Sequence, residues 1–300
     1  MEGLDGWVRG LDAQMRHLNE QLDRRLRATQ ALIARVYEAP AQWSAQVSAM
    51  RCEEGFEQAW EGEPLITVRI ATYNNAEILV ERTLPSLLRQ TYKNWEAIIV
   101  GDACSDDTGE RLAAIGDPRI SFENRPMRGP YPTDETARWY VAGIPGMNRA
   151  LERARGAWIA ALDHDDEWDD DHLEILLAEA KRTRAEIVYG KWRMVDVSNG
   201  KLIDHEFGDV FPPMEGAMAF QASLCHGGLA RFHYDMNAYL ADEPGDKNLT
   251  RRLWEAGVKF AFLDRAVVTY WFEPRSDWGR RWREDMIKAH GYVESETQHG

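Results

Sequence analysis

Apolar residues recur at alternating spacings of three and four positions along the first 36 residues of the chain, with one extra step of four. Charged and polar residues fill the positions between them, and the first proline is Pro40. This pattern predicts a long amphipathic helix or coiled coil within an N-terminal segment of residues 1–60. Such a helix either packs on its own domain or pairs with a second copy, and we expect a homo-oligomer through it. The stripe consists of Leu4, Val8, Leu11, Met15, Leu18, Leu22, Leu26, Thr29, Ile33 and Val36.

From Pro64 onward, short apolar runs alternate with amphipathic stretches. The apolar runs predict strands over residues 65–73, 95–102, 119–124 and 157–162. The amphipathic stretches predict helices over residues 76–90, 105–116 and 146–156. Strands that alternate with helices are typical of an α/β fold with a doubly wound, mostly parallel sheet flanked by helices.

Three carboxylates, Asp163, Asp165 and Asp166, follow the strand predicted over 157–162. Open parallel sheets bind ligands at the carboxyl ends of their strands, and hard divalent cations take oxygen ligands of this kind. Another predicted strand ends at Asp102, so these acids should meet at one edge. The sequence therefore predicts a site for a metal-bound diphosphate. The later acids at 169–171 are explained by the preference of acidic residues for the start of a helix.

Composition narrows the classes of protein that fit. The 300 residues carry a formal net charge of -14, which disfavours broad binding to nucleic acid or anionic lipid. No apolar run approaches the roughly 20 residues that cross a bilayer, and the N-terminus lacks a signal-peptide pattern. We therefore expect no membrane span and a cytoplasmic location. The odd number and wide spacing of Cys52, Cys104 and Cys225 predict free thiols.

Two stretches of the domain resemble family 2 of the inverting glycosyltransferases, which have a GT-A fold. They are PLITVRIATYNNAEILVERTLPSLLRQTYKNWEAIIVGDACSDDTGERL and GMNRALERARGAWIAALDHDDEW. The resemblance implies a UDP-sugar donor, with Thr72 and Tyr73 beside the nucleoside and Asp102 accepting a hydrogen bond from the base, usually uracil. It also implies that Asp163 and Asp165 form a D-x-D pair, the first near the ribose and the second holding Mn²⁺ or Mg²⁺ on the diphosphate.

The resemblance also implies a division of the chain. A GT-A domain over 61–275 would contain a nucleotide-sugar half, 64–166, and an acceptor half, 167–275. Residues 276–300 would form a basic C-terminal tail or a lid. The chain departs from the family at Gly101, where a second acid is common. Asp102 then acts alone, or it caps a turn.

The acceptor half contains GDKNLTRRLWEAG, which resembles the acidic motif at the start of the family's acceptor-side helix. Gly245 stands where glutamate is frequent. The resemblance implies that Asp246 is the catalytic base, which removes a proton from the acceptor as it attacks the anomeric carbon. Asp242 and Glu243 are rival candidates, and a helix cap explains Asp246 equally well from the sequence.

Segment 125–146 is longer than the connection expected between the two stretches, and we interpret it as a lid over the nucleotide and the acceptor. Arg128, or its neighbour Arg125, is expected to contact the nucleotide. His164 is interpreted as a turn residue rather than a metal ligand. Trp192 and His226 match positions that line the acceptor cleft in the family, although burial in the core is the commoner role of such residues. Aromatic rings stack on sugar faces, so Trp168, Trp192 and Trp271 are candidates only as a group.

Two other functions stay open. A nucleotidyltransferase also needs a carboxylate-held metal at a sheet edge, but it would have no use for Asp246 and would normally carry a Gly-rich basic loop after the first strand. A non-catalytic sugar-nucleotide-binding subunit could recruit a partner through the coiled coil. The acceptor stays open among a glycan, a natural product, a lipid and a peptide.

Overall fold

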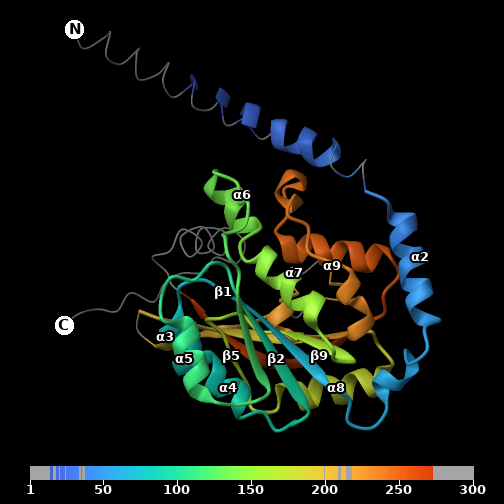
Figure 1. Ribbon diagram of the computed structural model, residues 1–300. Helices are drawn as coiled ribbons and strands as arrows, with labels where there is room; N and C mark the ends of the chain where they lie inside the picture. Colours follow the sequence, from blue (N-terminus) through green and yellow to red (C-terminus); the bar gives the residue numbers. More distant parts are fainter. Residues whose placement is uncertain are drawn as a thin grey trace.

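One curled sheet organises the molecule (Figure 1). The computed structural model describes residues 38–272 apart from 199, 209–210 and 214–217, together with scattered residues between 14 and 35. The strands in this part of the chain are β1 (Ile66–Thr72), β2 (Trp95–Gly101), β3 (Ile120–Asn124), β4 (Trp158–Ala161), β5 (Glu167–Trp168), β6 (Ile187–Asp196), β7 (Lys201–Phe207), β8 (Ser223–His226) and β9 (Phe260–Phe272). Their order is β3-β2-β1-β4-β8-β6-β9-β5, with β7 paired to β6.

The first half of the sheet is parallel. β1 lies between β2 and β4, and β3 extends the sheet beyond β2. Every residue of β1 and β2 is buried, because their continuous apolar runs face helices on both sides. The predicted strands of residues 64–166 are confirmed, and the carboxyl ends of β1, β2 and β4 point to one edge.

The second half of the sheet is mixed. β8 is antiparallel to both β4 and β6, β6 and β9 are parallel, and β5 and β7 add antiparallel pairs. The α/β fold class predicted from the sequence is confirmed, with a parallel core to which the antiparallel strands are added.

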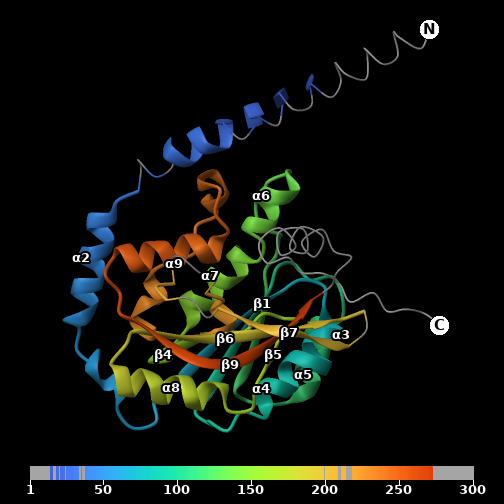
Figure 2. The same ribbon diagram turned by 180° about the vertical axis from the view of Figure 1, so that it is seen from behind.

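Helices cover both faces of the sheet (Figures 1 and 2). They are α2 (Pro40–Arg51), α3 (Ala76–Ile78), α4 (Leu84–Leu88), α5 (Thr108–Ile115), α6 (Glu135–Tyr140), α7 (Ile144–Arg153), α8 (His172–Thr183) and α9 (Gly245–Glu255). Short helical turns are η1 (Glu57–Trp60), η2 (Leu79–Thr83), η3 (Phe220–Ala222), η4 (Gly227–Arg231) and η5 (Ala238–Ala241). In both views α4, α5 and α8 lie on one side of the sheet, and α7 and α9 lie on the other.

The helix predicted over 76–90 is interrupted by a π-helical turn. η2 separates α3 from α4, just before Pro85. Proline has no N–H, and its ring crowds the preceding turn of a regular helix. A π-helical turn shifts the backbone hydrogen bonds and so accommodates the proline within the helical run.

The N-terminal segment leaves the domain at its surface. The described residues between 14 and 33 are helical, and Leu22 and Leu26 are 56% and 58% exposed. The blue segment runs away from the sheet in Figures 1 and 2. The continuous long helix predicted here is not confirmed, because several of its residues lie outside the described part. The predicted tail, 276–300, also lies outside it.

Ion pairs join this segment to α9. Arg251 is 5% exposed, and its Nη2 lies 2.6 Å from Glu38 Oε1 and 2.9 Å from Glu243 Oε2. Arg35 Nη2 lies 3.0 Å from Glu243 Oε1.

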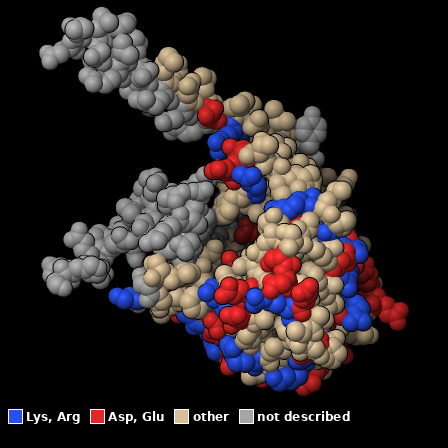
Figure 3. All heavy atoms as spheres, turned by 60° about the vertical axis from the view of Figure 1, so that its left-hand side comes forward, with Lys and Arg blue, Asp and Glu red and all other residues tan. Residues whose placement is uncertain are grey.

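Across the described helices, none combines the length and the apolar character needed to span a membrane. Figure 3 shows acidic and basic side chains interspersed over the described part of one face.

Candidate active site

The carboxyl ends of β1, β2 and β4 bring Thr72, Asp102 and Asp163 to one edge. The Thr72 carbonyl accepts a hydrogen bond from the Asp102 N–H at 2.9 Å. The Leu162 N–H donates to the Arg69 carbonyl at 3.1 Å, which holds β4 beside β1 up to the residue before Asp163. The Thr72 hydroxyl is buried and bonds to no described group, so a ligand at this edge could supply its partner.

Three hydrogen bonds and one longer ion pair hold the carboxylate of Asp102, which is 2% exposed. Its Oδ1 accepts hydrogen bonds from the Arg125 guanidinium and from the Gly129 N–H at 3.1 Å. Its Oδ2 accepts from the Tyr131 hydroxyl at 2.6 Å and lies 3.5 Å from Arg128 Nε. Burial raises the pKa of Tyr131, and the hydrogen bond to Asp102 raises it further, so the hydroxyl stays a donor. The start of the predicted lid is thus held on the end of β2.

Asn124 explains why the chain has glycine at position 101. Its Oδ1 accepts from the Cys104 N–H at 2.8 Å, and its Nδ2 donates to the Cys104 carbonyl at 2.8 Å. A Cβ at Gly101 would lie 2.7 Å from Asn124 Oδ1. A second acid therefore has no room before Asp102 while Asn124 brackets the turn.

Arg128 covers the ring of Tyr73. Its guanidinium carbon lies 3.3 Å from the ring centroid. The Tyr73 residue and the Arg128 side chain are 43% and 41% exposed. A guanidinium stacked on a phenol ring presents a flat face and N–H donors. Two of the predicted nucleoside contacts therefore lie together and offer a surface on which a base could stack.

Arg69 and Gln221 fix the orientation of Asp163. Arg69 lies inside β1, is 3% exposed, and its Nη1 is 3.3 Å from Asp163 Oδ1. Its Nη2 donates to the Tyr234 hydroxyl at 2.9 Å. The Gln221 amide donates to Asp163 Oδ2. The sequence analysis did not identify either partner. Arg69 could have been found, because a charged residue within a buried strand is almost always paired with an opposite charge.

Asp166 is buried beside Asp165 and has no well-formed hydrogen bond to the part of the chain that the structure describes. It is 1% exposed. Burial raises the pKa of Asp166 well above its ordinary value, and the charges of Asp165 and Asp163 add to this. Burial also raises the pKa of Asp165, against the opposing charge of His164. A divalent cation would stabilise the charged form of both carboxylates.

These acids fit an open metal site rather than a closed one. Nowhere in the described ranges do three His, Cys, Asp or Glu side chains converge closely enough to enclose a metal ion. Mg²⁺ in such sites takes one or two carboxylates and completes its shell with phosphate oxygens and water. The unpartnered carboxylate of Asp166 beside Asp165 suits that arrangement. His164 lies in the turn, as predicted, and its Nδ1 is 3.1 Å from the Ala71 carbonyl oxygen.

Asp246 lies in the first turn of α9 and belongs to the same charged region. Its side chain is exposed on one side. Desolvation by the protein on the other side raises the pKa of its carboxyl, and the charge of Asp163 raises this pKa further. The same acids also influence the pKa of Tyr270 on β9. Burial raises its pKa, and the charges of Asp166, Asp165, Asp163 and Asp246 add to that effect. The charges of the strand-end acids and of Asp246 on α9 therefore all influence Tyr270.

The rival acids differ from Asp246 in their surroundings. Glu243 is 3% exposed and accepts hydrogen bonds from Arg251 Nε at 2.9 Å and Asn248 Nδ2 at 3.0 Å. Burial alone would raise the pKa of Glu243, but these partners lower it overall. Asp242 is exposed at the end of η5 with a φ of 55°. Glu243 therefore has a structural role, whereas Asp242 and Asp246 both keep exposed side chains.

The N-cap of α9 is Pro244 and not Asp246. The Asp246 carboxylate accepts a hydrogen bond from the N–H of Lys247 at 2.7 Å. Its position in the first turn stabilises the helix dipole, but the capping position itself belongs to another residue. The interpretation of Asp246 as the N-cap of α9 is therefore wrong, although Asp246 lies in the first turn of this helix.

The C-terminal part of segment 125–146 reaches the start of α9. A Cβ at Gly245 would lie 2.7 Å from Ile144 Cδ1 and 3.3 Å from the Tyr140 carbonyl oxygen. α6, within the insertion, also contacts η5. Segment 125–146 thus extends from Asp102 to the acceptor-side helix, and this close packing explains why glutamate is absent at position 245.

Two of the aromatic candidates belong to the core. Trp168 is 1% exposed and stacks on His172 with ring centroids 4.0 Å apart. His226 is 5% exposed, and its Nε2 lies 3.1 Å from a backbone carbonyl oxygen. Neither can line the acceptor cleft. Trp192 and Trp271 are partly buried and stay candidates.

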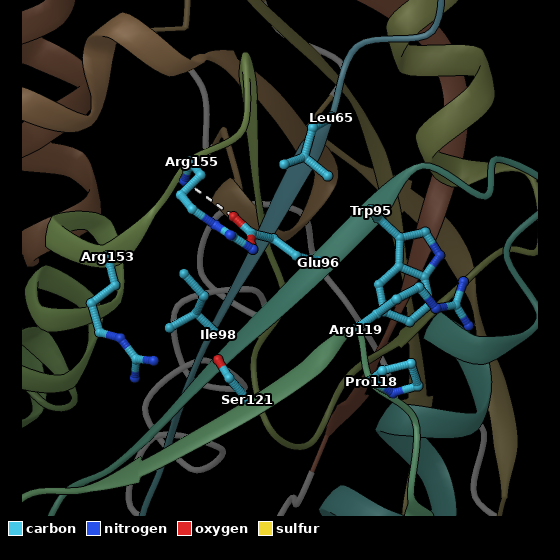
Figure 4. Close-up of a pocket in the computed structure, with 9 residues that line it drawn as sticks. All are labelled: Leu65, Trp95, Glu96, Ile98, Pro118, Arg119, Ser121, Arg153 and Arg155. Carbon is cyan, nitrogen blue, oxygen red and sulfur yellow. Dashed lines mark hydrogen bonds and ion pairs between the residues drawn. The ribbon is translucent and has the colours of Figure 1, made fainter.

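A pocket of about 610 Å³ lies at the opposite end of the sheet, where β1 and β2 begin (Figure 4). Its lining includes three arginines whose charges are already matched by carboxylates. The pairs are Arg119 with Asp117, Arg153 with Glu123 and Arg155 with Glu96. The pocket is remote from the strand-end acids and has no unmatched cation for a diphosphate.

Two of the curated relatives of the chain are named as glycosyltransferases of Escherichia coli. The chain is 29% identical to the putative colanic acid biosynthesis glycosyl transferase WcaA of Escherichia coli K12, over 41% of this chain and 40% of WcaA. It is 31% identical to the UDP-Glc:alpha-D-GlcNAc-diphosphoundecaprenol beta-1,3-glucosyltransferase WfgD of Escherichia coli, over 44% of this chain and 47% of WfgD. The matches thus span less than half the length of either relative.

A solved structure shares the fold. Residues 1–349 of Staphylococcus aureus TarS in complex with UDP superpose with a TM-score of 0.54 at 17% identity, over 70% of this chain and 61% of that one. A complex of the same protein with UDP-GlcNAc gives a TM-score of 0.54 at 16% identity, over 69% of this chain and 58% of that one.

The family model for glycosyl transferase family 2 matches residues 67–131 and 141–236. These ranges contain β1 to β4, the Asp102 turn and the strand-end acids, and they cover more than half of the 300 residues. Residues 132–140, between the ranges, lie within the insertion and include α6. The chain belongs to glycosyl transferase family 2.

Proposed function

We propose that the protein is a metal-dependent inverting glycosyltransferase that uses a UDP-sugar. What supports this proposal is the family match together with the position of Asp163, Asp165 and Asp166 directly after β4, at the carboxyl edge of the parallel sheet. A donor diphosphate needs acids of this kind to hold its metal ion, and an acceptor hydroxyl needs an acid as a base on the opposite side of the sugar. The UDP and UDP-GlcNAc complexes of TarS, which shares the fold, support uridine as the nucleoside.

The donor half would bind the nucleotide as follows. Arg128 and Tyr73 would form the stacking surface for the base, and Asp163, held by Arg69, would accept hydrogen bonds from the ribose. Asp165, with Asp166 behind it, would hold Mn²⁺ or Mg²⁺. The bound ion would stabilise the negative charge that grows on the leaving diphosphate.

Asp246 would act on the acceptor. Its carboxylate would take the proton of the acceptor hydroxyl while that oxygen forms a bond to the anomeric carbon. The bond from this carbon to the diphosphate breaks on the opposite face, so the configuration inverts and the electron pair leaves with UDP. The exposed side chain of Asp246 leaves its carboxylate oxygens accessible to an acceptor, which favours this role.

Substitution of Asp165 tests the donor site. Asp165→Asn should keep the fold but weaken UDP binding in the presence of Mn²⁺ by about tenfold or more, because an anionic ligand becomes neutral. Titration calorimetry with UDP and Mn²⁺ measures this. Asp170→Asn, at an exposed acid that pairs with Arg89, is the matched control. Equal affinity in wild type and Asp165→Asn would remove Asp165 from the metal site.

The acceptor is proposed from the relatives. The names of WcaA and WfgD refer to colanic acid and to a sugar on diphosphoundecaprenol. A sugar hydroxyl is therefore the first acceptor to screen, either in a free glycan or on a lipid diphosphate. The cytoplasmic location expected from the sequence stays a prediction.

We also propose that the N-terminal segment forms a homo-oligomer. Leu18 and Leu22 are each 56% exposed and Leu26 is 58% exposed, and they lie on the predicted heptad stripe. An isolated helix with such a stripe gains little stability in water unless the apolar seam is buried. Pairing with the same stripe of a second copy would bury it.

A further inference from the structure

We infer that Arg82 is a positioning residue of the donor site, because its guanidinium joins the acid turn, residues 163–166, to the ring of Trp271. It fixes the backbone of this turn and thereby the direction of the Asp165 carboxylate. The inference rests on the proposed metal-dependent binding of a UDP-sugar. It adds to that site a residue from the helical run that follows β1.

A hydrogen bond from Arg82 holds the backbone of the acid turn. The turn is closed by the Asp166 N–H, which donates to the Asp163 carbonyl at 3.3 Å. Arg82 Nη1 donates to the carbonyl oxygen of Asp165 at 3.4 Å. This carbonyl belongs to the peptide plane between Asp165 and Asp166. A hold on it from outside the turn therefore fixes how both side chains leave the backbone.

The ring of Trp271 sets the place of this guanidinium. The Arg82 guanidinium carbon lies 4.1 Å from the centroid of the Trp271 ring. Trp271 lies opposite Val195 in the parallel pair of β6 and β9, so the sheet fixes its backbone. A planar guanidinium can stack on an aromatic ring and donate hydrogen bonds in its own plane, whereas the ammonium group of lysine has no plane to stack. Lysine at position 82 would keep the charge and lose this geometry.

Arg82 reaches the acids from the π-helical turn η2. Its neighbours Leu79 and Thr83 are fully buried, so η2 is anchored against the core. A π-helical turn contains more residues than an α-helical one, which changes the direction of the side chains around it, and such turns are frequent at functional sites. The irregularity that accommodates Pro85 therefore also directs Arg82 toward the acid turn.

The charge of Arg82 acts on the same acids. Burial raises the pKa of the Asp165 and Asp166 carboxyls, and the charge of Arg82 opposes this effect in both. The N–H of Trp271 also lowers the pKa of Asp166, so the end of β9 approaches the acids at a second point. A test of the positioning role must therefore keep the charge, as substitution by lysine does.

Calorimetry on Arg82→Lys with UDP, once with Mn²⁺ and once with EDTA, tests the inference. We expect the affinity for UDP with Mn²⁺ to fall roughly 10–100-fold, as for other residues that orient metal ligands. The affinity for UDP in EDTA and the melting temperature without ligand should stay near those of the wild type. Arg89→Lys is the matched control, because Arg89 follows α4 in the same helical run and its exposed guanidinium pairs with Glu167 and Asp170.

Variants of Trp271 separate the stacking contact from other effects. Trp271→Leu removes the ring beside Arg82 and should reproduce the loss of metal-dependent affinity. Trp271→Phe keeps an aromatic ring and should retain most of this affinity. The double variant, Arg82→Lys with Trp271→Leu, should bind UDP with Mn²⁺ no more weakly than either single variant, because both substitutions break one contact.

Two results would overturn the inference. Wild-type affinity of Arg82→Lys for UDP with Mn²⁺ would show that Arg82 acts by its charge alone. Equal losses of affinity with Mn²⁺ and with EDTA, together with a lower melting temperature, would show a merely structural role. A wild-type protein that binds UDP equally well with and without Mn²⁺ would instead refute the proposed metal dependence on which the inference rests.

Discussion

Glu243 and Asp246 are two acids three positions apart that the structure places in different surroundings. Glu243 is buried against Arg251 and Asn248, and its oxygens accept hydrogen bonds from both. Asp246 is reached by solvent and is influenced by the charge of Asp163. A base needs an accessible lone pair, which Asp246 has and Glu243 lacks.

Loss of the Asp246 carboxylate should therefore stop transfer without affecting the donor. Asp246→Asn should lower the transfer rate by roughly 10²–10⁴-fold and leave UDP affinity nearly unchanged. Asp242→Asn, at the exposed end of η5, is the matched control and should transfer normally. A transfer assay on both variants, with UDP titration in parallel, decides the matter. Normal turnover by Asp246→Asn would show that the acid only stabilises the start of α9.

Much of the candidate site follows from the sequence, because its residues stand at predicted strand ends. Asp163 and Asp165 could be placed by the apolar run before them, and Tyr73 by the end of β1. The three hydrogen bonds to Asp102 could not be predicted, because their donors lie in segment 125–146, which has no periodic pattern. The burial of Asp166 without a well-formed hydrogen bond to a described group could not be predicted either, because it depends on how the chain packs around that residue.

Among the secondary-structure elements, long strands and helices were easier to predict from the sequence than short ones. The buried strands of the parallel half stand out as continuous apolar runs. β8 has four residues and β5 has two, which is too few for a period, so their antiparallel pairing could not be predicted. The π-helical turn before Pro85 was likewise hidden inside a good helical pattern.

The contact between α8 and β9 predicts a dependence of stability on pH. His172 is fully buried, its Nδ1 lies 2.9 Å from the Val267 carbonyl oxygen, and burial lowers its pKa to about 3. An unfolded histidine has a pKa of about 6.5, so the unfolded chain takes up the proton first. The contribution of neutral His172 is complete above pH ~6.5 and is lost as the pH falls toward ~3.

His172→Phe should remove this part of the dependence. The difference in unfolding free energy between wild type and variant should change by about 1.4 kcal/mol per pH unit below pH ~6. Urea unfolding at several pH values measures it, and the comparison cancels the acids that both proteins share. Parallel curves for the two proteins would show that His172 is already protonated in the fold.

For the whole molecule, we predict that the N-terminal segment determines the oligomeric state. Removal of residues 1–33 should leave a folded domain of smaller oligomeric state, because the exposed stripe is lost while Arg35 and Glu38 keep their ion pairs. Sedimentation velocity of the full and the shortened chain measures this. Glutamate at positions 18 and 22 of the full chain, Leu18→Glu with Leu22→Glu, should give the same result. A monomeric full-length chain would contradict the coiled-coil prediction.

The buried guanidinium of Arg251 has a consequence for communication within an assembly. It binds Glu38, where the N-terminal segment joins the domain, and Glu243, three residues before Asp246. A partner that pulls on the segment would therefore move the start of α9 through Arg251 and through the Arg35–Glu243 ion pair. If copies of the chain associate as proposed, the geometry of the acceptor site becomes a shared property of the subunits, and specific activity would fall on dilution as they separate.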